Sequence, residues 1–305
     1  MTEFGRVLTA MVTPFDEQGR VDYERAKQLA LALLDSGTDG LVLTGTTGES
    51  PTLSAEEKLQ LYAEIRSAIG TRGTIVAGTC NYNTAESIEL SREAARRGVD
   101  GILGTVPYYN KPPQEGLYQH FKAIAQAIDL PMILYNVPSR TVTNMLPETT
   151  IRLSQIANIV GIKEASGNFE GIAKIIQDSA PHFRVWSGDD SSTLPILAIG
   201  GYGIVSVASH LIGRQIQAMI THFVDGRPEE AAEIHRRTLP LVQALFVTTN
   251  PIPLKYALNR VGFSVGSTRL PLFGPDSKSA AVIDAALDEA TIDLPSTVAV
   301  GVALA

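Results

Sequence analysis

Lys163 ends a stretch of sequence that has the composition of a buried strand. In the segment IVGIKEASGN, residues 159–168, four residues without polar side chains precede the lysine, and Glu164 follows it directly. A lysine in such a place usually extends its amine to solvent. An amine kept inside an apolar wall instead has its pKa lowered from about 10.4 toward about 7–8, which favours the uncharged, nucleophilic form. Lys163 is therefore a candidate for forming a Schiff base with a carbonyl substrate.

Tyrosine and threonine side chains near other strand ends could move the protons that imine formation requires. Tyr135 lies near the end of the apolar segment PMILYNV, residues 131–137, where a tyrosine often serves only packing. Its phenol, with a pKa near about 10, needs a relay to act as general acid and base near neutral pH. The hydroxyls of GTTGES, residues 45–50, and a second phenol in PYYN, residues 107–110, are candidates for that relay.

Two further groups could bind carboxylates. In GTTGES, two glycines allow backbone N–H groups to approach a small anion, and Thr46 and Thr47 add hydroxyl donors, although a plain turn would have a similar composition. The segment lacks the Gly-Lys-[Ser/Thr] ending of a nucleotide-binding loop, so phosphate is not the expected ligand. Arg140 lies on the loop after Tyr135, and its planar guanidinium suits a second carboxylate.

The residues between these motifs alternate between strand and helix patterns. Asp22 can cap a helix that ends at Gly37. Ser54 and Glu57 have the spacing of a capping box. About eight apolar strands are expected, in RVLTAMVTP, GTDGLVLTG, TIVAG, GVDGILGT, PMILYNV, NIVGIKE, FRVWSGD and GGYGIVSV. Apolar strands separated by helices indicate a parallel sheet covered on its outer face, and about eight such units are typical of the (β/α)8 or TIM barrel.

The strand pattern stops near Arg227. Helical patterns follow it, in PEEAAEIHRRTLPLVQALF and AAVIDAALDEA. We therefore expect a catalytic (β/α)8 barrel over residues 1–226 and a C-terminal helical region over residues 227–305. An open doubly wound sheet is the alternative fold, but no Gly-x-Gly-x-x-Gly follows the first strand. The chain ends in an apolar tail, LPSTVAVGVALA, for which the sequence indicates no role.

Composition narrows the class of protein. The 305 residues carry a net charge of −7 with a pI of about 5.3, which argues against binding to nucleic acid or to an anionic membrane. Cys80 is the one cysteine, so a disulfide framework is impossible and the reducing cytoplasm is the expected location. The five histidines show no metal-ligand spacing, which disfavours a metal-dependent aldolase. Neither a signal peptide nor a membrane span is expected.

The motifs together are similar to those of the pyruvate-dependent class I aldolase family. The resemblance covers nearly the full length, in AMVTPFDEQG, GTTGESPTL, TVPYYNKPPQEGLYQHF, LYNVPSRT, GIKEASGN and NPIPLKYAL. It implies a (β/α)8 barrel with a C-terminal helical domain, assembled as a homotetramer that is a dimer of dimers. Within the family, the chain resembles the members that condense pyruvate with L-aspartate-4-semialdehyde, a step toward diaminopimelate and lysine. That chemistry needs no cofactor and no metal, since the lysine itself is the electron sink.

The resemblance also implies a role for each site residue. Lys163 would form the imine with pyruvate, and Tyr135 would be the general acid and base. Thr46 and Tyr109 would complete its proton relay, with Tyr109 supplied by the neighbouring subunit. The other residues would bind substrate: Thr47 the pyruvate carboxylate, Arg140 the carboxylate of aspartate semialdehyde, and Gly188 and Val205 the wall of the pocket.

Sister activities of the family are the alternative. N-acetylneuraminate lyases and 2-keto-3-deoxy-sugar-acid aldolases share the lysine, the tyrosine and a loop rich in glycine, threonine and serine. Arg140 after YNVPS favours an acidic aldehyde over a sugar, and GTTGES is the form of the loop in the enzymes that use aspartate semialdehyde. A barrel retained only as a binding protein is disfavoured, because the lysine, the relay and the anion sites are all present.

A regulatory site at the dimer interface is implied by the lysine-inhibited relatives. Ser50, Glu86 and Tyr108 fit its pattern. Three positions depart from the most sensitive enzymes, which have alanine, histidine and asparagine in place of Pro51, Ala55 and Tyr82. We therefore predict weak or absent inhibition by lysine.

Overall fold

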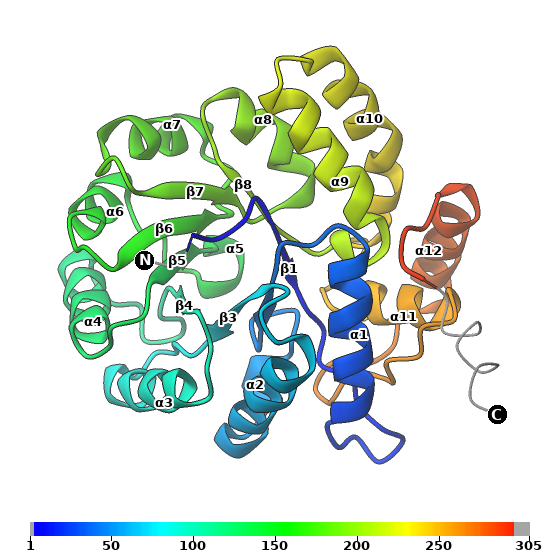
Figure 1. Ribbon diagram of the computed structural model, residues 1–305, viewed down its shortest axis with the longest axis horizontal. Helices are drawn as coiled ribbons and strands as arrows, with labels where there is room; N and C mark the ends of the chain where they lie inside the picture. The colour runs from blue at the N-terminus through cyan, green and yellow to red at the C-terminus, as the bar shows by residue number, and fades with distance from the viewer. Residues whose placement is uncertain (1–2, 296–305) are drawn as a thin grey trace.

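The computed structural model describes residues 3–295, and at its centre eight parallel strands close into a barrel (Figure 1). Each strand pairs with the next along the chain, and β8 pairs with β1. The strands are β1 (Val7–Ala10), β2 (Gly40–Leu43), β3 (Thr74–Gly78), β4 (Gly101–Thr105), β5 (Met132–Asn136), β6 (Ile159–Glu164), β7 (Arg184–Ser187) and β8 (Gly203–Ser206). Most of their residues are buried, because helices cover the outer face and side chains fill the interior. The predicted barrel is confirmed.

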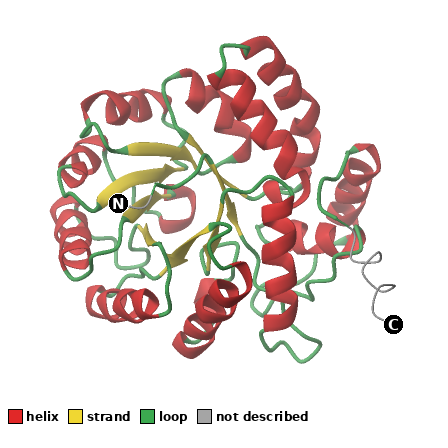
Figure 2. Ribbon diagram, viewed as in Figure 1, coloured by secondary structure: helices red, strands yellow, loops and turns green. Residues whose placement is uncertain are grey.

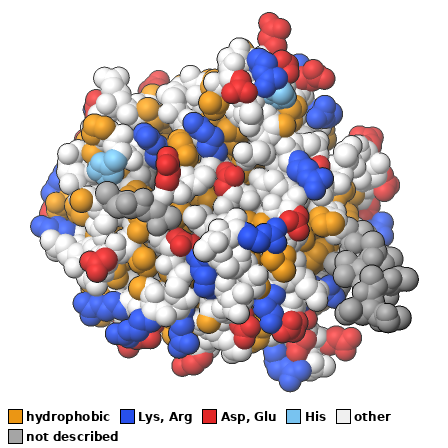
Figure 3. All heavy atoms as spheres, viewed as in Figure 1, with side chains coloured by type: hydrophobic (Ala, Val, Ile, Leu, Met, Phe, Trp, Pro, Cys, Tyr) orange, Lys and Arg blue, Asp and Glu red, His pale blue; other side chains and the backbone are white. Residues whose placement is uncertain are grey.

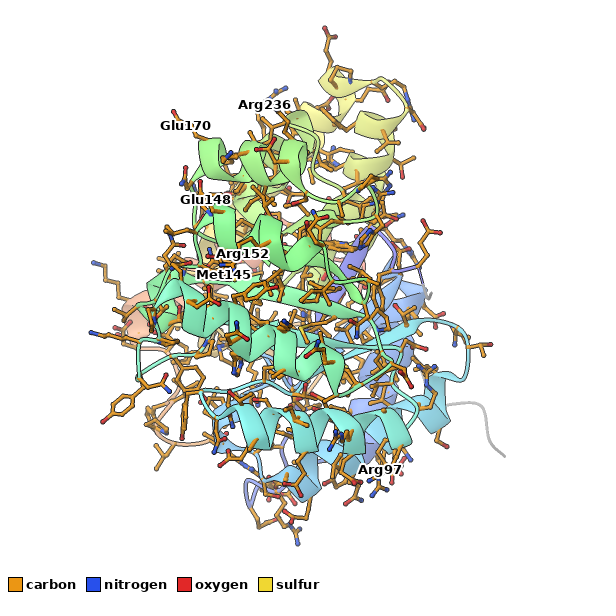
Figure 4. All side chains as sticks on the ribbon, turned by 90° about the vertical axis from the view of Figure 1, so that its left-hand side faces the viewer. Arg97, Met145, Glu148, Arg152, Glu170 and Arg236 are labelled. Carbon is orange, nitrogen blue, oxygen red and sulfur yellow. The ribbon has the colours of Figure 1, made fainter. Side chains whose placement is uncertain are left out.

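A ring of helices surrounds the strands (Figure 2). They are α1 (Tyr23–Asp35), α2 (Ala55–Ile69), α3 (Thr84–Arg96), α4 (Gln114–Gln126), α6 (Pro147–Ser154), α7 (Phe169–Asp178), α8 (Thr193–Ala198) and α9 (Ser209–Val224). The predicted caps form: Asp22 accepts a hydrogen bond from the backbone of Arg25, and Ser54 with Glu57 makes the capping box at the start of α2. The exposed faces are charged, as Arg152 of α6 and Glu170 of α7 illustrate (Figure 4).

A recurring pair of glycines joins three of these helices to the strands that follow. Two residues after α1, α3 and α8 end, a glycine takes a positive φ that L side chains rarely adopt. These residues are Gly37, Gly98 and Gly200, with φ of +101°, +78° and +100°. A second glycine then begins the strand three residues later. At Gly203 a Cβ would lie 2.1 Å from the carbonyl oxygen of Arg6, so the close approach of β8 to β1 requires glycine.

The interior of the barrel is a packed core. Its cluster of buried side chains consists of Phe4, Leu8, Ala10, Val42, Val76, Leu103, Ile133, Tyr135, Val137, Trp186 and Val205. Because these side chains fill the barrel, a small molecule can be bound only at one of its ends. Figure 3 shows acidic and basic side chains interspersed over the face that it presents.

Three further helices follow the barrel, as the sequence predicts from Arg227 onward. They are α10 (Pro228–Ala244), α11 (Ile252–Arg260) and α12 (Ser277–Glu289). In Figure 1, α10 runs beside α9, and α11 and α12 lie beyond α1. The division into regions 1–226 and 227–305 stays a prediction. Most of the apolar tail, residues 296–305, lies outside the described residues.

Candidate active site

A cavity of about 450 Å³ opens at the carboxyl ends of the barrel strands. Most of the predicted site residues line it: Thr46, Thr47, Tyr135, Arg140, Lys163 and Gly188. They come from the loops after β2, β5 and β7 and from the ends of β5 and β6, which the closed barrel brings to one rim. Sequence reasoning did not select the part of the wall contributed by the C-terminal helical region, namely Val242, Gln243, Phe246 and Asn250.

Lys163 lies on β6 between two aromatic neighbours, with Tyr135 opposite it on β5 and Trp186 on β7. Its side chain is buried, and Nζ lies 4.3 Å from the centre of the Tyr135 ring. The pKa of Lys163 is lowered to about 8: burial is the main cause, the charge of Asp190 opposes it, and the charge of Arg140 adds to it. Lys163 forms no ion pair within residues 3–295. Its amine is therefore desolvated and next to the cavity, as its strand-end position predicted.

Asp190 is a buried carboxylate near Lys163 that sequence reasoning did not select, although it belongs to the motif SGDD after β7. Its carboxylate accepts hydrogen bonds from the Ser206 hydroxyl and from the backbone N–H groups of Val207 and Ala208, at 2.5, 3.0 and 3.3 Å. Burial raises the pKa of Asp190, and these hydrogen bonds lower it. Asp190 thus holds the chain after β8 in place and favours the protonated form of the lysine.

Tyr135 is buried beside the lysine and interacts with Thr46. Burial raises the pKa of the Tyr135 phenol, while the charge of Arg140 and the hydrogen bond with the Thr46 side chain lower it. This contact joins two members of the predicted relay. Tyr109, the third, is 89% exposed with φ +70° and is not among the residues that line the cavity. Within one chain, therefore, the relay is present only as far as Thr46.

The loop that carries Thr46 and Thr47 is fixed by contacts on both sides. The Thr13 hydroxyl donates to the carbonyl oxygen of Gly48 at 2.7 Å, and the amide of Asn250 donates to Thr47 Oγ1 at 3.0 Å. Glu49 adopts φ +55° and is buried, and its carboxylate pairs with Lys255 of α11 at 2.6 Å. The backbone of the loop is thus held in its turn by the barrel and by the C-terminal helices.

Arg140 lies at the rim of the cavity, in the short helix α5 (Pro138–Thr141). Its guanidinium is exposed and donates to the carbonyl oxygen of Asn250 at 3.4 Å. Gly188 leaves room at the wall, because a Cβ there would lie 3.1 Å from Lys163 Cγ and 2.8 Å from the side chain of Ala165. These two residues therefore lie at the cavity that the sequence predicted for them.

Val205, the remaining predicted wall residue, is on β8 and packs in the barrel interior with Tyr135 and Trp186. Val207, two residues further on, lines the cavity instead. The alternation of side chains along a strand does not by itself locate the floor of a cavity, so the sequence could not distinguish these two valines.

The predicted effector residues lie away from the cavity. Glu86 belongs to α3, and its negative charge and the burial of Tyr108 both raise the pKa of that phenol. The Tyr108 ring packs edge-to-face against Tyr82, with ring centres 5.1 Å apart. Ser50 begins the short helix η1 (Ser50–Thr52) at the end of the GTTGES loop. The structure brings Glu86 and Tyr108 together, and their regulatory role stays a prediction.

Two kinds of feature are absent from residues 3–295. No group of three or more histidine, cysteine, aspartate and glutamate side chains there could hold a metal ion. No helix in that range has the length and apolar character needed to cross a membrane.

Comparisons with known proteins agree with the barrel fold. Residues 3–290 match the model of the dihydrodipicolinate synthetase family. The chain belongs to this family. The predicted resemblance to pyruvate-dependent class I aldolases is thus confirmed for the enzymes that use aspartate semialdehyde, over the sugar-acid aldolases that were the alternative.

Several members of the dihydrodipicolinate synthetase family are close to this chain. The 4-hydroxy-tetrahydrodipicolinate synthase of Dehalococcoides mccartyi is 60% identical over 295 residues, which cover 97% of this chain and 99% of that protein. The enzyme of Cyanidioschyzon merolae, solved with lysine bound, is 50% identical with a TM-score of 0.93, covering 94% of this chain and 98% of that one. The chloride-inhibited enzyme of Acinetobacter baumannii, complexed with pyruvate, is 37% identical with a TM-score of 0.91, covering 94% and 99%.

Proposed function

We propose that this chain is a 4-hydroxy-tetrahydrodipicolinate synthase, a lyase that condenses pyruvate with L-aspartate-4-semialdehyde in diaminopimelate and lysine biosynthesis. The observation that carries the proposal is the Lys163 amine, buried without an ion pair in the described chain, next to the Tyr135 phenol and at the wall of a cavity. With its pKa lowered to about 8, an appreciable fraction of this amine is uncharged near neutral pH. The names of the family members at 50–60% identity support the same activity.

In the first half of the reaction, Lys163 Nζ attacks the C2 carbonyl carbon of pyruvate and forms a carbinolamine. Tyr135 protonates the hydroxyl that leaves as water, and the imine results. The Thr46 hydroxyl, hydrogen-bonded to Tyr135, passes protons to and from it. The Thr47 hydroxyl donates a hydrogen bond to the pyruvate carboxylate. This contact keeps the carbonyl carbon of pyruvate within reach of the amine.

In the second half, the imine loses a proton from C3 of the pyruvate unit and becomes an enamine. This carbon attacks the aldehyde of aspartate semialdehyde, forming the new carbon–carbon bond, while Arg140 at the rim binds the substrate's carboxylate. The amino group of the second substrate then displaces Lys163 from the imine, which releases a cyclic product and the free lysine. Gly188 leaves room for the substrates, and Val205 supports Tyr135 from the barrel interior.

The exposed Tyr109 completes the relay from a neighbouring subunit in this proposal. Its side chain is 89% exposed on the single chain, which leaves it available to a second copy. We therefore propose that the chain associates with further copies, as a homotetramer built as a dimer of dimers. We also propose that the enzyme is located in the cytoplasm. Lysine is expected to inhibit weakly or not at all, because of Pro51, Ala55 and Tyr82. Half-inhibition at sub-millimolar lysine would contradict this last expectation.

The test is chemical trapping followed by a comparison of acceptors. Incubation with pyruvate and sodium borohydride should add one reduced pyruvate unit to Lys163, located by peptide mass spectrometry, whereas the Lys163→Arg variant should remain unmodified. In a separate assay with pyruvate and without borohydride, the enzyme should consume aspartate semialdehyde and should not consume N-acetylmannosamine. Failure to trap an adduct would contradict the Schiff-base mechanism. Turnover of N-acetylmannosamine but not of aspartate semialdehyde would indicate an N-acetylneuraminate lyase instead.

A further inference from the structure

Asn250 connects the two groups that are proposed to bind carboxylates. It lies between α10 and α11, is 5% exposed and lines the cavity. Its side-chain amide donates from Nδ2 to Thr47 Oγ1 at 3.0 Å, across a separation of 203 residues in the sequence. Its backbone carbonyl oxygen accepts from Arg140 at 3.4 Å. One residue of the C-terminal helical region therefore contacts both ends of the site.

The direction of the Asn250–Thr47 hydrogen bond determines what Thr47 can do. An amide nitrogen only donates, whereas a hydroxyl has one proton to give and two lone pairs to receive. Thr47 Oγ1 is thus the acceptor in this pair, and its proton remains free. Within residues 3–295, that proton is donated to no other group, although Thr47 is buried to 2% exposure at the wall of the cavity. The partner that suits a free hydroxyl proton there is an anion.

The side-chain oxygen of Asn250 is also available to a ligand. Asn250 Oδ1 is buried and has no hydrogen-bond partner among the described residues. Buried polar atoms are rarely left in that condition in folded proteins. Since Asn250 lines the cavity, a molecule within the cavity is what this amide can meet.

We propose that Asn250 is a positioning residue for the condensation, which occupies a lone pair of the Thr47 hydroxyl and thereby commits the hydroxyl proton to the carboxylate of the 2-oxo acid. The proposal rests on the role of Thr47 proposed above and adds the residue that orients it. A rotating hydroxyl could otherwise turn its proton toward a protein acceptor, and part of its interaction with the carboxylate would be lost. The helical region after the barrel thus helps to select the carboxylate-bearing substrate.

A double-mutant cycle between two uncharged replacements tests this coupling. The variants are Asn250→Ala, Thr47→Val and the combination of both, and the readouts are KM and kcat for pyruvate. Asn250→Ala alone should raise the KM for pyruvate about tenfold with a smaller change in kcat, as expected for a hydrogen bond to a charged group. In the Thr47→Val background, the same replacement should raise the KM much less, since the hydroxyl that it orients is gone and only a contact of Oδ1 with the bound molecule remains to be lost.

Three controls separate positioning from a merely structural role. In the Thr47→Ser background, which keeps the hydroxyl, Asn250→Ala should again raise the KM about tenfold. Methyl pyruvate, which has no carboxylate, should be trapped on Lys163 by cyanoborohydride equally well in the wild type and in Asn250→Ala. The KM for aspartate semialdehyde should change little, because Arg140 is bound by the backbone of Asn250 and that backbone remains.

The outcomes that overturn the inference are specific. Equal increases in KM in the wild-type and Thr47→Val backgrounds, or equal losses with pyruvate and methyl pyruvate, would mean that Asn250 supports the fold and does not orient the hydroxyl. If Asn250→Ala does not fold, the isosteric Asn250→Asp serves instead: as an acceptor it would take the Thr47 proton, so unchanged pyruvate binding in that variant would also overturn the inference. Trapping of pyruvate by the wild type fails only if the proposed function itself is wrong.

Discussion

Two buried lysines of this protein have similarly lowered pKa values, but only one of them forms an ion pair in the described chain. Burial lowers the pKa of both Lys163 and Lys255 to about 8. Lys163 borders the cavity and has no ion pair within the described chain, and its amine lies over the ring of Tyr135. Lys255 is 2% exposed and is not among the residues that line the cavity. Its amine pairs with Glu49 at 2.6 Å and donates to the carbonyl oxygen of Ser267 at 3.0 Å.

The difference shows that a lowered pKa does not by itself mark a nucleophile. The amine of Lys255 is held by its ion pair with Glu49, and this pair joins α11 to the loop that carries Thr47. The amine of Lys163 has lost water without gaining an equivalent partner. A shift in pKa from 10.5 to about 8 corresponds to about 3 kcal/mol of disfavoured charge at either lysine, and only Lys255 has a carboxylate paired with its amine in the described chain. Access and the lack of a partner distinguish the reactive amine from the structural one.

The largest expected effect comes from removing the reactive amine. Lys163→Ala should lower kcat by at least about 10³-fold, because the covalent intermediate can no longer form. Borohydride with pyruvate should give no adduct, as measured by intact-protein mass spectrometry. By contrast, the folded fraction of Lys255→Met should still be trapped at Lys163. Trapping at Lys255 in the Lys163→Ala variant would break the distinction between the two lysines.

Removing the structural amine should instead destabilise the fold. Lys255→Met leaves the Glu49 carboxylate buried without its partner, and we expect the free energy of unfolding to fall by about 3–5 kcal/mol. Urea unfolding at one fixed protein concentration measures this. The double variant Lys255→Met with Glu49→Gln should recover most of the loss, since the uncompensated charge is gone. If the single and double variants are equally unstable, the ion pair is not what Lys255 contributes.

The pH dependence of trapping should reflect the lowered pKa of Lys163. Protonated amine does not attack a carbonyl, so at sub-saturating pyruvate the rate of cyanoborohydride trapping should rise nearly tenfold per pH unit well below 8, and roughly fiftyfold from pH 6 to pH 8. Above pH 8 the rate should level off. A rate that continues to rise to pH 10 would indicate an ordinary exposed lysine and would contradict the burial argument.

The smallest expected effect is a gain in stability from Lys163→Met. This replacement removes a buried amine that forms no ion pair within residues 3–295, and burial disfavours its charge more than Asp190 favours it, so unfolding at pH 7 should require about 1–3 kcal/mol more than in the wild type. Because the pKa of Lys163 is lower in the folded state, wild-type stability rises with pH between about 8 and 10.5, and the gain should shrink over that window. Urea unfolding at pH 7 and at pH 9.5 tests both statements. A loss of stability at pH 7 would place Lys163 in the same class as Lys255.

Much of the barrel could be predicted from the sequence because its local signals are repeated. The paired glycines at 37 and 40 recur at 98 and 101, and each pair ends a helix and begins a strand. The strands appear as short apolar runs because helices cover one face and the core the other. Once eight such units are recognised, closure of the barrel brings the ends of all strands to one rim. Lys163, Tyr135 and the GTTGES loop could therefore be placed together without coordinates.

Other parts of the site could not be found in this way. Asn250 contributes to the wall through a contact that spans 203 residues, and nothing in its local sequence indicates Thr47 as its partner. Asp190 directly follows the predicted strand FRVWSGD, but its hydrogen bonds to the chain after β8 depend on the register of two strands. Tyr109 cannot reach its proposed position within one chain, so its role depends on a neighbouring subunit and stays a prediction.

The amino-acid sequence alone determined the order of the elements, the closed barrel and the presence of a lysine at the end of an apolar strand, because periodicity and turn chemistry are local properties. The sequence also selected Lys163 as the candidate nucleophile. Only the tertiary structure showed that its amine borders a cavity and that the amine of Lys255 is held in an ion pair. Lys163 and Lys255 both occur in apolar surroundings, and the difference between them is a carboxylate from a distant loop and the distance to a cavity. Desolvation and pairing act through space, so the packing of the chain determines them.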